Sequence, residues 1–407
     1  MNGPESPTVA RVLRGQLCTG CGLCASLSGG EIEMTTVAPG YARPSRPGPL
    51  SPAAERMVAE ACPGSRVEPW TGKAPNLHPY WGPWRRVATG HSTDEALRHR
   101  ASSGGAVTAL ALHALRSGLV DRVVHVAADP QRPTRNIVVC STSEAEVIAG
   151  AGSRYAASSP LAEINGILSD GGRFAFIGKP CDVSALRRLG RVDPRVEAHV
   201  PLMLSFFCAG VPSHNGADRV LAAMGCAPQE VVAFRYRGEG WPGFATATLR
   251  DGRQAQMSYA DSWGGHLSKE VQFRCKICPD AVGGVADIAC ADAWYGDEAG
   301  YPSFEEQAGR SLIVARTARG EAHLEAAVSA GALAVEPLPV DEIDAMQPSQ
   351  ARRKRLIQAR TAGVKAMLQP CPEMADLSVA EAARRAQGRE TLKDFLGTVR
   401  RILQGRR

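Results

Sequence analysis

Three thiols lie within seven residues near the N-terminus of this chain, in the stretch CTGCGLC. Cys18, Cys21 and Cys24 are each separated by two residues, and a fourth cysteine, Cys62, stands directly before a proline. A C-x2-C-x2-C run with a further Cys-Pro is the ligand pattern of ferredoxin-type [4Fe–4S] clusters. Zinc is the alternative, since structural zinc sites are also built from four cysteines, usually as two C-x2-C pairs. The third cysteine at the same spacing favours the iron–sulfur cluster.

A second set of cysteines lies deeper in the sequence. Cys275 and Cys278 form a C-x2-C pair, while Cys181 and Cys208 each follow a strand-like run. Strand ends are where α/β proteins build their sites, so these four thiols are candidates for a second cluster. Spacing alone equally allows one redox pair and two buried structural thiols. Cys290 lies close enough to the pair to replace one of the ligands.

Two segments are candidates for binding a flavin, the common converter between one-electron clusters and two-electron substrates. The stretch ASSGG places Ser102, Ser103 and Gly104 at a predicted helix start, where free N–H groups and the helix dipole favour phosphate. The stretch GSRYAAS contains Arg154 and Tyr155, side chains that can pair with a diphosphate and stack on a ring. An ordinary N-cap and a plain turn explain the same residues without a ligand.

The elements that must position these residues alternate between strand and helix. Short apolar runs at 122–126, 173–178 and 202–208 suit buried strands, and residues 103–118 predict a helix that starts at serine and stops at glycine. Residues 244–260 predict a hairpin with an Asp-Gly turn. The alternation indicates an α/β core.

The basic charge of the chain is concentrated at its C-terminal end. Residues 351–407 hold 14 Arg and Lys against 5 Asp and Glu, within a net charge of +6 for the whole chain. Such a tail can meet nucleic acid, an anionic membrane surface or an acidic redox partner, although a solvated helical face is the simplest interpretation. Phe395 is its one aromatic residue, and the charge is separate from the cysteines. Both observations disfavour a zinc-stapled nucleic-acid binder.

Targeting signals are not evident in the sequence. No uninterrupted apolar stretch approaches the roughly 18 residues of a transmembrane span, and the first residues lack the apolar centre of a signal peptide. We therefore expect a cytoplasmic protein without a transmembrane segment. In that reducing compartment, twelve cysteines indicate metal ligands or catalysis rather than disulfides.

Over about residues 15–300 the chain resembles the beta subunit family of coenzyme F420 hydrogenases and dehydrogenases. The resemblance rests on six ordered segments, C-x2-C-x2-C, ASSGGAVTALALHAL, GSRYAAS, GKPCDVSALR, FFCAGVPS and FRCKICPDAVGGVADIACADAW. That family also includes 7-hydroxymethyl chlorophyll a reductase and ferredoxin-dependent divinyl chlorophyllide 8-vinyl reductase. The resemblance implies an FAD enzyme with [4Fe–4S] clusters, the second of them on the core cysteines. It also implies flavin contacts at Ser102, Ser103, Gly104, Thr108, Ser153, Arg154 and Tyr155.

The chain departs from the family where archaeal members often have a threonine before Pro-Cys. Lys179 stands there, and it can offer a charge to a flavin carbonyl or an anionic substrate, or simply face solvent. The departure leaves coenzyme F420 itself open as the partner. Further along, we expect a substrate-facing segment at 234–247, with a packed strand and turn as the alternative. Its candidate residues are Arg235, Arg237, Trp241 and Phe244.

These observations predict a mixed α/β chain in three parts. A small ferredoxin-like iron–sulfur domain occupies 1–75, an α/β core that binds FAD and the second [4Fe–4S] cluster occupies 76–345, and a basic helical tail occupies 346–407. Residues 76–90 are expected to be a linker into the core.

The predicted function is that of an iron–sulfur flavoprotein oxidoreductase. A ferredoxin or a partner redox subunit would exchange electrons with the N-terminal cluster, and a small planar organic substrate, an F420-like deazaflavin or a tetrapyrrole, would exchange a hydride through FAD. Flow in either direction is allowed, and a homo-oligomer is possible. The alternative is a non-catalytic electron-transfer subunit of a larger hydrogenase or dehydrogenase complex. Candidates for a proton donor are His91, Tyr155, Asp182 and His266.

Overall fold

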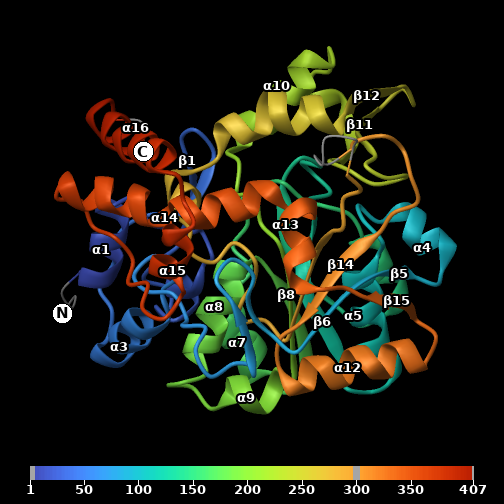
Figure 1. The fold of residues 1–407 in the computed structure, drawn as a ribbon, viewed down its shortest axis with the longest axis horizontal. Coiled ribbons are helices and arrows are strands. Elements are labelled where there is room, and N and C mark those ends of the chain that lie inside the picture. Colours follow the sequence, from blue (N-terminus) through green and yellow to red (C-terminus); the bar gives the residue numbers. More distant parts are fainter. Residues whose placement is uncertain (1–4, 297–302, 406–407) are drawn as a thin grey trace.

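A mixed eight-stranded sheet organises the computed structural model, which describes residues 5–296 and 303–405 (Figure 1). Four neighbouring strands run parallel at its centre, in the order β13 (Ile288–Asp292), β9 (Leu202–Phe206), β8 (Phe174–Gly178) and β6 (Arg122–Ala128). Antiparallel strands extend both edges, with β14 (Ser311–Ala315), β5 (Arg86–Ser92) and β15 (Leu333–Pro337) beyond β13, and β7 (Asn136–Ser141) beyond β6. The predicted α/β core is therefore present.

Both faces of this sheet are buried, because alternate residues of each central strand contribute to different cores. Ala175 belongs to one apolar cluster, while Phe174 and Phe176 belong to the other. The first cluster includes side chains of α5 (Ala106–Arg116), α6 (Glu144–Ala149) and α12 (Ala318–Ser329). The second includes side chains of α3 (Pro52–Ala61), α7 (Ile164–Ser169), α8 (Pro180–Leu189), α9 (Arg195–His199) and α13 (Ile343–Met346). Helices on both faces are what a parallel sheet requires.

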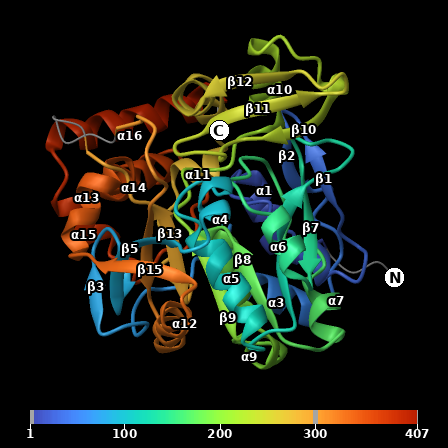
Figure 2. The same cartoon turned by 90° about the vertical axis from the view of Figure 1, so that its right-hand side faces the viewer.

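A smaller antiparallel sheet lies at one end of the main sheet (Figure 2). It contains β10 (Val231–Arg235), β11 (Phe244–Leu249) and β12 (Gln254–Ser258), and its core also holds residues of α10 (His214–Ala223). The hairpin predicted at 244–260 is β11–β12, and its Gly252 has a φ of +87°, a conformation that favours glycine.

The three predicted strand runs are confirmed as β6, β8 and β9, but the helix predicted at 103–118 begins later. It is α5, which starts at Ala106 with Gly105 as its N-cap at a φ of +78°. Ser103 does not cap the helix because its hydroxyl donates to the carbonyl of Arg310 at 2.9 Å.

Residues 76–90 are not a linker. They form the hairpin of β3 (Asn76–His78) and β4 (Gly82–Trp84) and most of β5. Tyr80 and Trp81 are buried in the same core as the central strands, and the packing of these two side chains holds the segment against the sheet.

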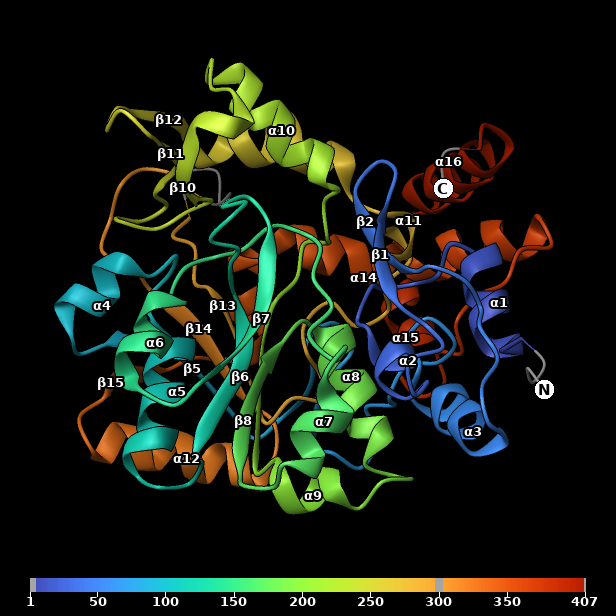
Figure 3. The ribbon, with the colours of Figure 1, turned by 180° about the vertical axis from the view of Figure 1, so that it is seen from behind.

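The N-terminal segment lies beside the helical tail, as Figures 1 and 3 both show. The N-terminal segment contains α1 (Pro7–Arg14), α2 (Leu23–Ser26), β1 (Met34–Val37), β2 (Tyr41–Pro44) and α3. The tail is helical as predicted, with α14 (Pro348–Ala366), α15 (Val379–Arg384) and α16 (Gly388–Leu403). Val12 and Leu17 share a small core with Val364 and Ile402.

The remaining short elements are α4 (Glu95–Arg100), α11 (Phe273–Lys276), η1 (Pro228–Glu230), η2 (Ala260–His266), η3 (Leu267–Glu270) and η4 (Val340–Glu342). Within residues 5–296 and 303–405, none of the helices combines the length and the hydrophobicity that a transmembrane span requires.

Replacing Phe176 by alanine should reveal how much the central strands depend on packing at both faces. Phe176 is fully buried in β8, so we expect Phe176→Ala to lower the free energy of unfolding by about 3–5 kcal/mol. Phe244→Ala is the matched control, because this phenylalanine is 47% exposed and should cost far less. Urea denaturation of both variants measures the difference, and equal losses would contradict the assignment of Phe176 to the core.

Candidate functional site

The carboxyl ends of three parallel strands converge on one region of the molecule. β8 ends just before Lys179 and Cys181, β9 ends just before Cys208, and β13 ends at Asp292. Parallel strands present their carboxyl ends at the same edge of the sheet, and loops that leave this edge build most α/β sites.

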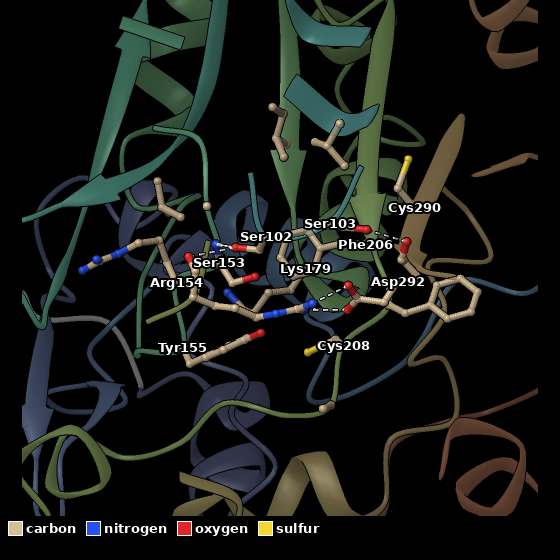
Figure 4. A pocket seen from close by; sticks show the side chains of 18 of the residues that line it. Ser102, Ser103, Ser153, Arg154, Tyr155, Lys179, Phe206, Cys208, Cys290 and Asp292 are labelled. Carbon is tan, nitrogen blue, oxygen red and sulfur yellow. Dashed lines mark hydrogen bonds and ion pairs between the residues drawn. The ribbon is translucent and has the colours of Figure 1, made fainter. Parts of the chain in front are cut away.

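A cavity of about 300 Å³ lies at this edge (Figure 4). Seven of the eight predicted flavin contacts line it, namely Ser102, Ser103, Thr108, Ser153, Arg154, Tyr155 and Lys179. Gly104 is not among the lining residues. A Cβ at Gly104 would lie 2.6 Å from the carbonyl oxygen of Gly90 and 2.7 Å from the backbone nitrogen of Ser311, so glycine is needed there for close backbone packing.

The N-terminus of α5 opens on the cavity without a side-chain cap. Gly105 is the N-cap, and Ala106, Val107 and Thr108 of the first turn line the cavity. The backbone N–H groups of a first turn have no partner within the helix, so they and the helix dipole form a site for an anion. The hydroxyl of Ser102 instead holds the loop, since it accepts from the backbone N–H of Ser153 at 2.6 Å.

Arg154 lines the cavity, but its guanidinium is largely engaged elsewhere. Four of its five N–H donors are used, by the side chain of Asn136 and by backbone carbonyls of Phe234, Pro133 and Arg135. Figure 4 shows this side chain directed away from Lys179 and Asp292. The guanidinium therefore braces the wall of the cavity and has little capacity left for a diphosphate.

A buried ion pair adjoins both the cavity and the core cysteines. The Nζ of Lys179 is 2.7 Å from the Oδ2 of Asp182, and both residues line the cavity. Burial opposes the charge of the lysine, but Asp182 and the thiols of Cys181 and Cys208 raise the pKa of Lys179 overall. Burial also raises the pKa of Asp182, although the lysine works against that effect.

Part of the cavity wall is aromatic and is organised by a second buried ion pair. The guanidinium of Arg237 forms two hydrogen bonds of 2.7 Å with the carboxylate of Asp292, and it lies 4.6 Å and 4.8 Å from the ring centroids of Tyr259 and Trp294. Trp241 donates to the same carboxylate at 2.8 Å. Burial opposes the charge of Arg237, but Asp292 raises the pKa of the guanidinium.

The four N-terminal cysteines lie near enough for their thiols to act on one another electrostatically. Burial raises the pKa of each of these thiols, that of Cys62 to about 11, and the charges of Cys18 and Cys62 act on the other thiols of the set. The backbone N–H of Gly20 donates to the sulfur of Cys18 at 3.4 Å. Gly22 has a φ of +88° and packs so closely on Ala162 that any side chain would collide.

The four core cysteines also form one set. Burial raises the pKa of Cys181, Cys208 and Cys278, that of Cys208 to about 12, and the thiols of the set act on one another electrostatically. The sulfur of Cys275 accepts from the backbone N–H of Val211 and from the amide of Gln272, both at 3.4 Å.

Cys290 does not join the core set. Burial raises the pKa of its thiol to about 12, and the charge that acts on it is that of Arg316 rather than another thiol. Figure 4 shows Cys208 and Cys290 apart, below and above Asp292 in that view. Among residues 5–296 and 303–405, no three His, Cys, Asp or Glu side chains are arranged to hold a single metal ion.

Comparison with known proteins identifies the family. The N-terminal and C-terminal models of the coenzyme F420 hydrogenase/dehydrogenase beta subunit match residues 87–165 and 171–341. This chain belongs to the F420 hydrogenase/dehydrogenase beta subunit family. The core cysteines and most of the cavity lie within the matched residues, while the N-terminal cysteines and the helical tail, including Gln350 of the cavity wall, lie outside them.

The relatives of this chain that carry names are oxidoreductases or subunits of oxidoreductases. The coenzyme F420 hydrogenase subunit beta of Methanococcus voltae is 24% identical over 70% of this chain and 98% of its own length. The chloroplastic 7-hydroxymethyl chlorophyll a reductase of Oryza sativa subsp. japonica is 26% identical over 45% of this chain and 38% of its own. A chain of the F420-reducing [NiFe] hydrogenase complex from Methanosarcina barkeri has a TM-score of 0.54 at 20% identity, covering 74% and 99% of the two chains. That last likeness shows the fold.

The sequence motifs do not identify several of the residues that line the cavity. They are His125, Tyr259, Trp263, Asp292 and Trp294. Asp292 ends the apolar strand β13 and Trp294 follows it closely, a position that could have marked them. Of the segment 234–247, Arg237 lines the cavity, Trp241 packs behind it on Trp294, and Phe244 is exposed.

The structure places two of the four candidate proton donors at the cavity. Tyr155 and Asp182 line the cavity, whereas His91 and His266 do not. His125 also lines it, and its Nε2 lies 2.8 Å from the hydroxyl of Ser141.

Removing the carboxylate of Asp292 should destabilise the aromatic wall strongly. Asp292→Ala leaves the buried guanidinium of Arg237 without its counter-ion, so we expect a loss of about 3–5 kcal/mol in the free energy of unfolding. Glu144→Ala is the control, because its pair with Arg116 is about half exposed and should contribute less than about 1 kcal/mol. Denaturant titration measures both, and a small loss for Asp292→Ala would show that Arg237 does not need this partner.

Proposed function

We propose that this chain is an iron–sulfur flavoprotein oxidoreductase that passes electrons between two [4Fe–4S] clusters and, through FAD, a small planar organic substrate. One observation carries the proposal. Cys208 belongs to the core set of thiols and also lines the cavity, so a cluster held by that set would adjoin a flavin held in the cavity.

Both thiol sets fit [4Fe–4S] clusters. Backbone N–H groups donate to the sulfurs of Cys18 and Cys275, and such hydrogen bonds stabilise the thiolate form that a cluster requires. Each thiolate of a cluster binds a different iron, so the four sulfurs of a set need not converge on one point. Burial raises the pKa of most of these thiols, so they are protonated when no cluster is bound. Binding of a cluster would displace the protons.

The cavity fits FAD. The uncapped N-terminus of α5 suits the diphosphate, and the buried Oε1 of Gln350, which lines the cavity, has no hydrogen-bond partner among the described residues. A flavin bound there would exchange single electrons with the clusters and a hydride with the substrate. Lys179, which also lines the cavity, places a positive charge beside it.

Aromatic residues of the cavity wall suit a planar substrate such as an F420-like deazaflavin or a tetrapyrrole. Tyr155, Tyr259, Trp263 and Trp294 line the cavity, and the guanidinium of Arg237 lies over the rings of Tyr259 and Trp294. Rings held in this way lose little entropy when a flat ligand stacks on them. Among the proton-donor candidates, Tyr155 and Asp182 remain because they reach the cavity.

The exposed face of α16 suits an acidic redox partner, a ferredoxin or a partner subunit. Leu392, Leu396 and Leu403 are more than half exposed, and Arg389, Lys393 and Arg400 are exposed on the same helix at helical spacing. The buried face of α16 contributes Ile402 to the core that also contacts Cys18 and Cys62. A partner docked on α16 would therefore lie close to the N-terminal thiols. We place the protein in the cytoplasm, where its cysteines stay reduced, and leave a homo-oligomer as an option.

A second candidate function is that of an electron-transfer subunit without a substrate of its own. The name of the Methanococcus voltae relative, a hydrogenase subunit, favours it together with the exposed leucines of α16. Turnover of the isolated chain separates the two functions. Reduction of a planar acceptor by dithionite-reduced protein supports the enzyme, and reduced flavin without turnover supports the subunit.

Cofactor content tests the proposal directly. Protein purified without oxygen should contain about eight irons, about eight acid-labile sulfides and one FAD per chain. Cys21→Ala should lose about half of the iron and slow electron entry while FAD stays bound, whereas Cys290→Ala should keep all of the iron. Zinc in place of iron, or full iron in Cys21→Ala, would overturn the cluster assignment.

Charge reversal on α16 tests the partner surface. We expect Arg389→Glu/Arg400→Glu to slow reduction by an acidic ferredoxin about tenfold or more at low salt. The difference should be smaller at 0.15 M salt, where the Debye length is about 8 Å and the charges are screened. Arg132→Glu/Arg250→Glu, in the β6–β7 loop and the β11–β12 turn, makes the same change in net charge and should leave the rate near that of the wild type. Equal slowing in both double variants would point to net charge alone.

A further inference from the structure

The two thiol sets meet at one short segment, Gln272–Cys275. The amide of Gln272 lies 3.5 Å from the backbone oxygen of Thr19 and 3.4 Å from the sulfur of Cys275. Thr19 follows the first cysteine of the N-terminal set, so one buried side chain touches the loops of both sets.

Arg274, two residues further on, is buried at the same contact. It is 2% exposed, and its Nη2 donates to the backbone oxygen of Pro63, the residue after Cys62, at 2.9 Å. Among the described residues it has no acidic partner within ion-pair distance, and its Nε has no hydrogen-bond partner. Burying an unpaired charge is costly, and the buried Arg237 at the cavity is paired with the carboxylate of Asp292.

The charge of Arg274 reaches a thiol in each set. Burial raises the pKa of Cys62 and of Cys278, and the guanidinium lowers both. Other cations act within one set. Arg43 acts on Cys18, and Arg353 acts on Cys208 and Cys278.

We propose that Arg274 is the shared counter-ion of the two clusters and raises the reduction potential of both. The proposal rests on the proposed function, since it requires a cluster on each thiol set. Four thiolates make each cluster anionic, and reduction adds one electron and one further negative charge. A fixed cation between the clusters stabilises the reduced form of each, and the low dielectric of a buried site strengthens that effect. Arg274 thus acts on both clusters through its charge and keeps their two reduction potentials within the same range.

The test is a dithionite titration of anaerobic protein with redox mediators, followed by electron paramagnetic resonance, in which each cluster takes up one electron. In Arg274→Gln, both midpoint potentials should shift to more negative values. Arg43→Gln should shift the N-terminal cluster alone, and Arg353→Gln the core cluster alone. Iron and sulfide content of every variant identifies the clusters that are present.

A purely structural arginine would leave the potentials where they are. Unchanged potentials in Arg274→Gln, or a shift of one cluster only, would overturn the proposal. If Arg274→Gln loses iron, Arg274→Met replaces it, because methionine also removes the charge while its apolar side chain fills part of the same buried space, and both potentials should again fall. Unchanged potentials in that variant would also overturn the proposal. Wild-type protein without two cluster signals would instead refute the proposed function itself.

Discussion

The common direction of the central strands is the constraint on which the rest of the structure depends. Because β13, β9 and β8 are parallel, their carboxyl ends deliver Asp292, Cys208 and the Lys179–Cys181 segment to one edge of the sheet. Helices must then cover both faces of the sheet, and α5 arrives with its N-terminus at the same edge. The cavity and the core cysteines thus share one origin in the topology.

Two buried cations in this region are each paired with a carboxylate. Lys179 meets Asp182 beside the cysteines, and Arg237 meets Asp292 behind the aromatic wall. Each pair fixes the side chains around it, because moving either partner would leave a buried charge alone. Arg274 has no carboxylate within ion-pair distance among the described residues, and it lies at the contact between the two sets of thiols.

The N-terminal segment and the helical tail complete the molecule outside the residues that the family models match. They pack on each other through Val12, Leu17, Val364 and Ile402, and this small core contacts Cys18 and Cys62. An outer electron-entry module built in this way would need both ends of the chain. Residues 1–75 also contribute Leu23 and Ala61 to the core of the main sheet, which ties the N-terminal thiols to the rest of the site.

The sequence by itself determined what is local. The spacing of Cys18, Cys21 and Cys24 marks a ligand loop because the three thiols are contiguous, and the apolar runs of β6, β8 and β9 mark strands because burial on both faces requires them. The ordered motifs also indicated the family. Local pattern placed the start of α5 three residues early, since the partner of Ser103, Arg310, is distant in sequence.

Only the tertiary structure decided which distant residues meet. Gly104 is required by a backbone approach from β5 and β14, and Arg154 is occupied by carbonyls of two other segments, so neither role was visible in its own motif. Asp292, Tyr259 and Trp294 enter the site because Arg237 draws them together across the fold. Spacing along a chain fixes neighbours within a few residues, whereas a long-range contact depends on the strand order and on the packing of whole layers, which no single motif contains.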